Sequence, residues 1–245
     1  MKEPIVIKEY CKIVMPFFSG YGAALHEVTC EKNSPEPSFI EHSFGIDESM
    51  NQFIKLGSID TANRMMLAKK QPKSNLDYTF VISSKKALHK KVIFKEVKTN
   101  DHEKRFRILW KSSFGQAKTA KYLWGWVNPV MFTTMSEKDG FHSQIQIAYP
   151  TEKLIFKVLF PFMYPLQINP TLIRVDKDGK EHQLKILKRT EISKMKFDFN
   201  FEHKTYFRMY STVIHKPLLG QTYKVVWRIG YKNLSKYLSW IEANQ

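Results

Sequence analysis

Three features that often show where a protein works are scarce in this sequence: cysteines, long apolar runs and a leader segment. Only 2 of the 245 residues are cysteine, Cys11 and Cys30, which is too few for a disulfide framework. The most apolar stretch, residues 154–168, is too short to span a bilayer and is interrupted by Lys157 and two prolines. The first residues lack the basic and apolar regions of a signal peptide. We therefore expect a cytoplasmic protein without a membrane span.

Recognisable catalytic and cofactor motifs are also missing. The sequence holds no Gly-x-Ser-x-Gly turn, no Gly-x-x-x-x-Gly-Lys loop and no Gly-x-Gly-x-x-Gly run. His26 and Cys30 stand four residues apart, but no Cys-x-x-Cys or His-x-x-x-His pair accompanies them, so no metal site is predicted. Asp176 and Asp178 flank a turn, where acidic residues serve turn geometry. The sequence therefore predicts no catalytic residue, no cofactor and no metal, and an unrecognised enzyme stays open as an alternative.

The residues that are abundant indicate a folded, strand-rich protein. Hydrophobic residues make up 43% of the chain, which is enough apolar surface to offset the entropy lost on folding. The aromatic residues are mostly Phe and Tyr, 18 and 11 of them, and both types favour strands.

The C-terminal half shows the clearest pattern, an alternation of apolar and polar residues with a period of two. Tyr223, Val225 and Trp227 alternate with polar neighbours, which places them on the buried face of a strand, with Trp227 as a core residue. The Asp-Gly pair within residues 176–180 supplies the positive φ of a hairpin turn. We predict seven strands, at residues 141–149, 154–160, 171–175, 182–187, 195–201, 205–214 and 223–231. Short strands at this spacing are typical of an antiparallel, immunoglobulin-like β-sandwich.

The N-terminal half is predicted to be a separate β-rich domain, residues 1–136, with a small helical insertion. Strands are expected at residues 5–15, 78–83, 92–97 and 105–110. Apolar spacing in residues 47–70 predicts two short helices joined by a turn, although residues 51–56 also alternate and could form a strand. A polar cluster at residues 136–140 marks the boundary to the sandwich domain, residues 141–231. Residues 232–245 are expected to form a short closing helix.

The positive charge of the chain is concentrated in its central part. Lys and Arg outnumber Asp and Glu by 39 to 23. Residues 64–121 alone hold 16 basic and 4 acidic residues, a net charge of +12. A basic face of this kind can attract a polyanion or an acidic protein surface. The candidate polyanion-binding residues are Lys85, Lys86, Lys90, Lys91, Arg105, Arg107, Lys111, Lys118 and Lys121.

Two arrangements of this block could bind nucleic acid. If residues 47–70 form two helices, the strands at 78–83 and 92–97 could follow them as the basic wing of a winged helix. In the other arrangement, basic and aromatic residues of segment 104–126 would form a groove for a single strand. A helical insertion beside a lysine-rich hairpin, or a half-buried strand with a solvated basic face, explains the same patterns without nucleic acid.

One resemblance rests on turn and core residues of the C-terminal half. These are Phe141-His142, Tyr149-Pro150, Phe160-Pro161, Lys216-Pro217, Gly220, Tyr223 and Val225-Val226-Trp227. This rhythm resembles the β-sandwich accessory modules that sit beside effector or sensor domains in bacterial defence and signalling proteins. The resemblance covers residues 141–231, implies partner recognition rather than catalysis, and carries over no functional residue.

The sequence thus predicts a non-enzymatic recognition or regulatory protein that docks an acidic protein partner, in a bacterial defence or signalling setting. The alternative is a nucleic-acid-binding protein that uses residues 64–121.

Overall fold

The computed structural model of the chain consists of β-strands and their connections. It describes residues 4–16, 22–34, 39–45, 54–56, 77–82, 92–99, 103–110, 119–128, 140–162, 164, 166–194, 206–228 and 230. These ranges hold fifteen strands and no helix, which confirms the predicted mainly β fold. Within the same ranges, no helix is long and apolar enough to cross a bilayer.

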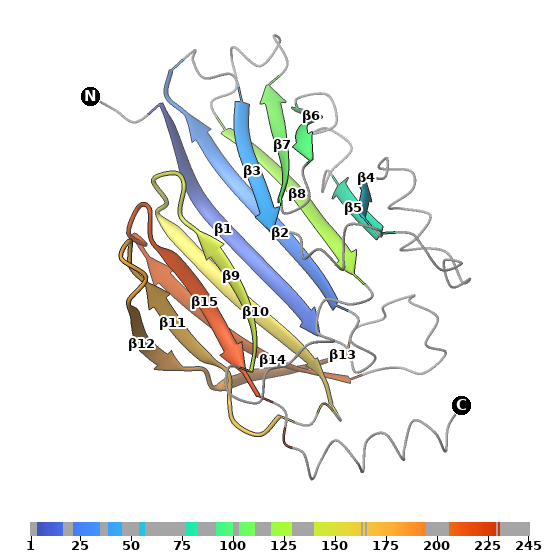
Figure 1. The fold of residues 1–245 in the computed structure, drawn as a ribbon, viewed down its shortest axis with the longest axis vertical. Helices are drawn as coiled ribbons and strands as arrows, with labels where there is room; N and C mark the ends of the chain where they lie inside the picture. Colours follow the sequence, from blue (N-terminus) through green and yellow to red (C-terminus); the bar gives the residue numbers. More distant parts are fainter. Residues whose placement is uncertain are drawn as a thin grey trace.

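The largest element is an eight-stranded sheet, called the large sheet here, which is built from both ends of the sequence (Figure 1). In this sheet β1 (Ile5–Pro16) lies between β10 (Lys153–Pro161) and β2 (Gly22–Lys32). The pairing of β1 with β10 is parallel, whereas β1 and β2 pair antiparallel. Beyond β10 follow β14 (Tyr206–His215) and β13 (Arg189–Lys194), and beyond β2 follow β8 (Thr119–Asn128), β5 (Asp77–Ile82) and β4 (Ile54–Leu56).

Two smaller sheets cover one face of the large sheet. The four-stranded sheet has the order β12 (Glu181–Ile186), β11 (Thr171–Val175), β15 (Thr222–Trp227) and β9 (Phe141–Gln146). The three-stranded sheet has the order β3 (Phe39–Gly45), β7 (Glu103–Trp110) and β6 (Val92–Thr99). Both lie in front of the large sheet in Figure 1, the first near β10 and the second near β2 and β8.

The strand register shows why a single face carries both covers. Lys12 of β1 is directly opposite His26 of β2 and Phe156 of β10, and direct cross-strand partners point to the same side of a sheet. The Lys12 side chain donates a hydrogen bond to the Gln144 carbonyl of the four-stranded sheet. Close to His26, Tyr122 of the large sheet shares a hydrogen bond with His42 of the three-stranded sheet. The covered face is therefore continuous from β14 to β8.

The sandwich expected in the C-terminal half consists of the four-stranded sheet and the β10–β14 part of the large sheet. Trp227 is fully buried, as predicted, and its ring lies 5.6 Å from that of Phe160 in an edge-on arrangement. Phe160 in turn meets Tyr210 at 5.7 Å. The Trp227 indole N–H donates to the Tyr164 hydroxyl at 3.4 Å, so its polar atom has a partner inside the core.

The strand pairing crosses the boundary expected near residues 136–141. β1 belongs to the N-terminal half, yet it pairs with β10 over five residues, from Tyr10 opposite Leu154 to Val14 opposite Val158. The polar cluster at residues 136–139 lies outside the described residues. The second layer of the sandwich therefore continues into strands that the sequence assigned to another domain.

The helical insertion predicted within residues 47–70 is wrong where the structure describes it. Ile54–Leu56 is strand β4, paired parallel with β5, as the alternation of residues 51–56 allowed. The other residues of 47–70, the strand expected at 195–201 and the helix expected at 232–245 lie outside the described residues.

The β11–β12 hairpin follows the turn chemistry predicted for residues 176–180. The Gly179 N–H donates to the Asp176 carbonyl and the Asp176 N–H donates to the Lys180 carbonyl. Gly179 has a φ of 81°, in the left-handed region that glycine adopts without steric cost. This is a three-residue hairpin loop, a type I turn followed by a left-handed glycine.

Candidate functional site

The most unusual chemistry in the described residues lies inside the molecule. Six side chains on the covered face of the large sheet and on β3 form what we call the inner polar cluster: Tyr10, Lys12, His26, His42, Tyr122 and Trp124. Each of them is at most 9% exposed. Because β1, β2 and β8 are neighbours in register, Lys12, His26 and Trp124 stand side by side across the sheet.

Two histidines make the central polar contacts of this cluster, His26 within the large sheet and His42 between the layers. The His26 ring is stacked on Trp124, with ring centroids 3.8 Å apart, and a hydrogen bond of 2.7 Å joins its Nδ1 to the Tyr10 hydroxyl. His42 comes from β3 of the covering sheet, and a hydrogen bond of 2.6 Å joins its Nε2 to the Tyr122 hydroxyl on β8. The three-stranded sheet is thus attached to the large sheet through specific polar contacts as well as through the buried Ile40 and Ile108.

Burial disfavours the charged form of each titratable side chain in the cluster. It lowers the pKa of His42 to about 3 and depresses the pKa of His26 well below its usual value, the latter with help from the nearby Lys12. Burial lowers the pKa of Lys12 from 10.5 to about 7, and the Lys12 ammonium donates to the Gln144 carbonyl on β9. The pKa values of Tyr10 and Tyr122 are raised by burial, so both phenols keep their protons.

The geometry of the cluster suits structural roles. A reactant would reach Lys12 or the histidines only if the covering sheets moved away, because all six side chains are buried between layers. Among the described residues no group of three His, Cys, Asp or Glu side chains could hold a metal ion. Cys11 and Cys30 are buried and form no disulfide within the described residues, and burial raises the pKa of the Cys11 thiol to about 11.

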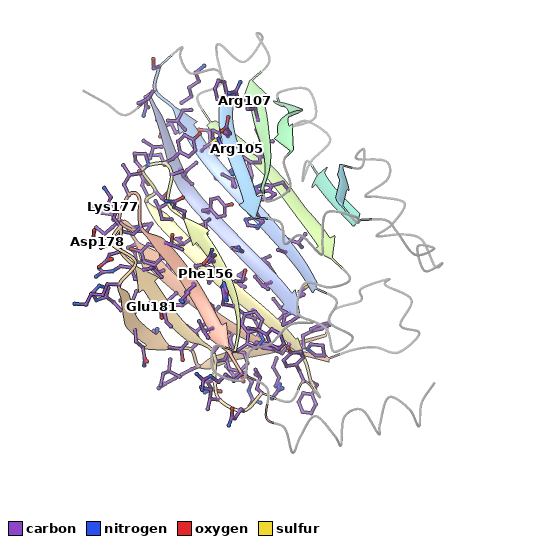
Figure 2. The ribbon with its side chains drawn as sticks, in the orientation of Figure 1. Arg105, Arg107, Phe156, Lys177, Asp178 and Glu181 are labelled. Carbon is purple, nitrogen blue, oxygen red and sulfur yellow. The ribbon has the colours of Figure 1, made fainter. Side chains whose placement is uncertain are left out.

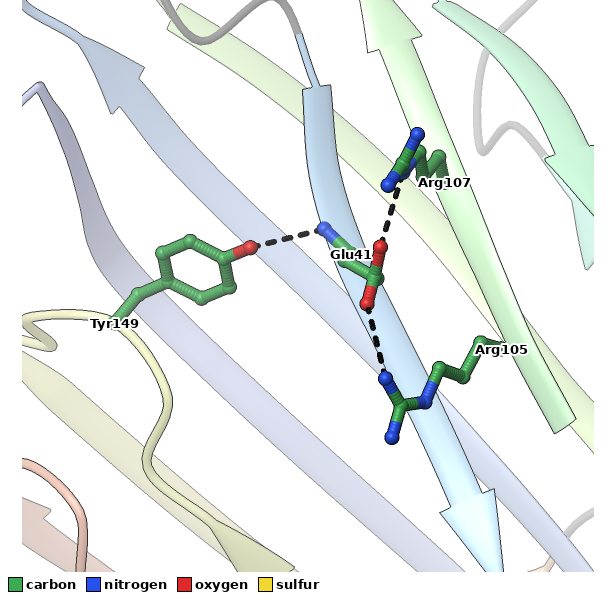
Figure 3. A network of polar contacts seen from close by, with 4 residues as sticks. All are labelled: Glu41, Arg105, Arg107 and Tyr149. Carbon is green, nitrogen blue, oxygen red and sulfur yellow. Dashed lines mark hydrogen bonds and ion pairs between the residues drawn. The ribbon is translucent and has the colours of Figure 1, made fainter. Parts of the chain in front are cut away.

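Of the nine candidate polyanion-binding residues, the structure describes three, and each lies near a carboxylate. Arg107 Nε is 2.9 Å from Glu41 Oε2, and Arg105 Nη1 is 4.0 Å from Glu41 Oε1 (Figure 3). The Glu41 N–H donates to the Tyr149 hydroxyl at 3.0 Å. Lys121 Nζ lies 3.5 Å from Glu27. The remaining candidates, Lys85, Lys86, Lys90, Lys91, Lys111 and Lys118, lie outside the described residues.

Two of the aromatic residues of segment 104–126, Tyr122 and Trp124, point into the molecule and not to a surface where bases could stack. Tyr122 and Trp124 are fully buried or nearly so, in the inner polar cluster. The Arg107 guanidinium is itself stacked on a protein ring, 4.2 Å from the centroid of Phe39. The two strands of segment 104–126, β7 and β8, belong to different sheets.

The wing expected for a winged helix is also wrong. The strands near 78–83 and 92–97 do not pair with each other: β5 pairs with β8 and β4, and β6 pairs with β7. They lie in separate sheets, so they cannot form the hairpin that a wing requires.

A surface that the sequence did not single out lies at β12, which we call the β12 edge (Glu181–Ile186). β12 is the last strand of the four-stranded sheet, and five of its six residues are exposed. Two of them are large and apolar, Leu184 at 45% and Ile186 at 55% exposure. Figure 2 shows Lys177 and Asp178 at the tip of the hairpin and Glu181 at the start of β12, far from Arg105 and Arg107 in this view.

The comparisons with known proteins give no family for this chain. No protein-family model matches the chain, and no curated protein matches it either. Among solved structures, the chain is similar to the crystal structure of a putative protease from Parabacteroides distasonis, with a TM-score of 0.48 and 8% sequence identity. The similarity covers 91% of this chain and 40% of that protein, so this chain spans less than half of its length.

Proposed function

We propose that this chain is a recognition protein that docks an acidic protein partner on its four-stranded sheet, in a bacterial defence or signalling setting as the sequence resemblance implies. The observation that carries the proposal is the β12 edge, where exposed apolar side chains stand among lysines. Buried apolar contacts supply most of the affinity at protein interfaces, and a charged rim steers the partner in.

The distribution of exposed apolar residues supports this choice of surface. Among the residues whose side-chain exposure the structure describes, the exposed large hydrophobic ones lie in the C-terminal half of the chain: Phe162, Ile168, Leu184, Ile186, Val213, Leu218 and Leu219. The same half carries excess positive charge, with 17 basic and 8 acidic residues in 141–245. Apolar area and positive charge therefore coincide on this half.

The alternative, a nucleic-acid interface on residues 64–121, is supported less well. A polyanion at β7 would have to compete with Glu41 for Arg105 and Arg107, and at β8 it would compete with Glu27 for Lys121. A reaction at the inner polar cluster would need the layers to separate.

A capture experiment with matched surface variants tests the proposal. The tagged full chain is incubated with native lysate with and without nuclease, and the captured proteins are identified. We expect an acidic protein that is retained after nuclease treatment, is lost from the double variant Leu184→Gln/Ile186→Gln, and is kept by Val213→Gln, which removes an equally exposed apolar group from β14. Capture that disappears with nuclease would instead support the nucleic-acid function.

A further inference from the structure

The β12 edge has an unpaired side in the described part of the structure. β12 pairs with β11, and no described strand lies beyond it in the four-stranded sheet. An edge strand presents a row of backbone N–H and C=O groups on which another extended chain can pair. The burial pattern of β12 shows the same openness, because only His182 is even partly buried.

Backbone hydrogen bonds on both sides of β12 show which of its amide groups face outward. At one end the Asp176 N–H donates to the Lys180 carbonyl, and at the other the Leu187 N–H donates to the Pro170 carbonyl. Antiparallel pairs alternate between hydrogen-bonded and non-hydrogen-bonded, so His182, two residues after Lys180, bonds toward β11. Gln183, opposite Ile173, therefore directs its N–H and C=O to the open side.

The side chains around this open side favour an acidic, partly apolar occupant. Leu184 and Ile186 offer apolar contact at the edge itself. Residues 177–189 contain five basic residues (Lys177, Lys180, Lys185, Lys188 and Arg189) and two acidic ones (Asp178 and Glu181), which gives +3. One of the acids, Glu181, is already engaged by Lys224 in an ion pair, so the exposed lysines dominate the local field.

We propose that the β12 edge binds its partner by strand addition, taking up an extended segment that alternates acidic and apolar residues. The inference rests on the proposed function and specifies how the partner is held. Backbone hydrogen bonds to the outward amides would fix the added strand, and the lysines would select its charge. A second copy of this chain is a poorer occupant, because two edges of +3 would face each other.

The test uses a defined probe and a pair of variants at one position. The probe is a fluorescent peptide of alternating Glu and Val, and two control peptides have Lys in place of Glu or N-methyl groups on every amide, so that neither edge of the methylated strand can donate a hydrogen bond. Gln183→Pro removes the outward N–H and puts a ring on the open side, while the bonds of His182 and Lys185 toward β11 stay. Gln183→Ala removes the same side chain but keeps the N–H. Tryptophan fluorescence melts check that both variants are folded.

We expect the full chain and Gln183→Ala to bind the acidic probe with similar affinity, and Gln183→Pro to bind it at least about tenfold more weakly, as expected for one or two lost hydrogen bonds. Neither control peptide should bind. Equal binding by Gln183→Pro, or binding of the N-methylated peptide, would overturn strand addition. Failure of the acidic probe to bind the wild-type chain at millimolar concentration would overturn it as well.

The protein captured from lysate separates this inference from the proposed function. If that protein is lost from Leu184→Gln/Ile186→Gln but kept by Gln183→Pro, docking at this surface stands and strand addition is wrong. If both variants keep it, the surface itself is wrong. A dimer of the wild-type chain that Gln183→Pro abolishes would assign the edge to a second copy and overturn the acidic partner.

Discussion

The two small sheets cover the same face of the large sheet with different chemistry. Beneath the four-stranded sheet the contacts are aromatic and aliphatic, with Trp227, Phe160 and Phe141 in contact. Beneath the three-stranded sheet they include two histidine–tyrosine hydrogen bonds, His26–Tyr10 within the large sheet and His42–Tyr122 across the layers. Apolar packing contributes stability roughly in proportion to buried area, whereas buried polar groups are costly unless their partners are placed correctly. We infer that the four-stranded sheet contributes mainly stability, whereas the polar contacts of the three-stranded sheet fix its position on the large sheet.

The largest effect should come from separating the two regions along the chain. A fragment from residue 138 onward lacks β1, which pairs with β10 over five residues. Although the sequence suggests an independent C-terminal domain, we expect this fragment to lack a cooperative melt, because β10 becomes an exposed apolar edge. Circular dichroism melts measure it. As a control, cleavage at a protease site introduced within residues 129–139 should leave the two pieces associated. A cooperative melt of the isolated fragment would show instead that the sandwich folds without β1.

The next largest effect is expected in the apolar core. Trp227→Ala removes a fully buried ring that contacts Phe160 and Phe141, so the free energy of unfolding should fall by about 3–5 kcal/mol. Urea denaturation measures the difference. Trp227→Phe should lose less, since it keeps an aromatic ring in the site. A loss below about 1 kcal/mol for Trp227→Ala would mean that the four-stranded sheet contributes little to the fold.

A smaller effect, visible in its pH dependence, is expected from Lys12 at the junction of the two regions. Its pKa is lowered from 10.5 to about 7 in the folded chain, so the unfolded chain binds more protons between these values. Stability should therefore rise with pH across that window, by up to about 1.4 kcal/mol per pH unit. Lys12→Met should lose this slope and be more stable than wild type at pH 7. Denaturation curves at several pH values between 7 and 10 measure the free energy of unfolding. If it changes with pH equally in both proteins, the pKa of Lys12 is not lowered in the folded chain.

The smallest effect should come from the ion pairs outside both cores. Arg105 and Arg107 are 48% and 38% exposed, so their contacts with Glu41 are screened by solvent. We expect Arg105→Ala to change the free energy of unfolding by about 0–1 kcal/mol. Arg107→Ala should cost somewhat more, because the guanidinium also covers Phe39. Thermal melts at low and high salt measure the loss of stability in both variants. A large loss that does not depend on salt would mean that these arginines contribute by buried packing and not by exposed ion pairs.

Local patterns predicted the four-stranded sheet well. Alternation in β15 and β9, and the Asp-Gly turn between β11 and β12, specify strand positions within a few residues. β2 and β8 were not predicted as strands; in β2 the polar His26 interrupts the apolar face. The parallel pairing of β1 and β10 leaves no local signature, since Cys11 and its neighbour Ile155 are far apart in sequence.

The candidate sites were predictable only in part, for related reasons. The inner polar cluster was missed because a histidine on a strand predicts a surface position unless the covering layer is known. One signal was available: Ala24, Val28 and Cys30 stand at even spacing with His26, which places the histidine on a buried face. The β12 edge could not be predicted, because the order of strands in a sheet decides which strand is last, and that order depends on pairings distant in sequence.

The position of β1 has a consequence for the newly made chain. β1 and β2 leave the ribosome together and can pair at once, but the other neighbour of β1 begins at Lys153. At about 5–20 residues per second, roughly 140 residues of translation take on the order of ten seconds. For that time one side of β1, with Tyr10 and Val14, has no strand to pair with. The nascent chain therefore exposes an aggregation-prone β1–β2 hairpin, and we expect a chaperone to bind it until β10 has been synthesised.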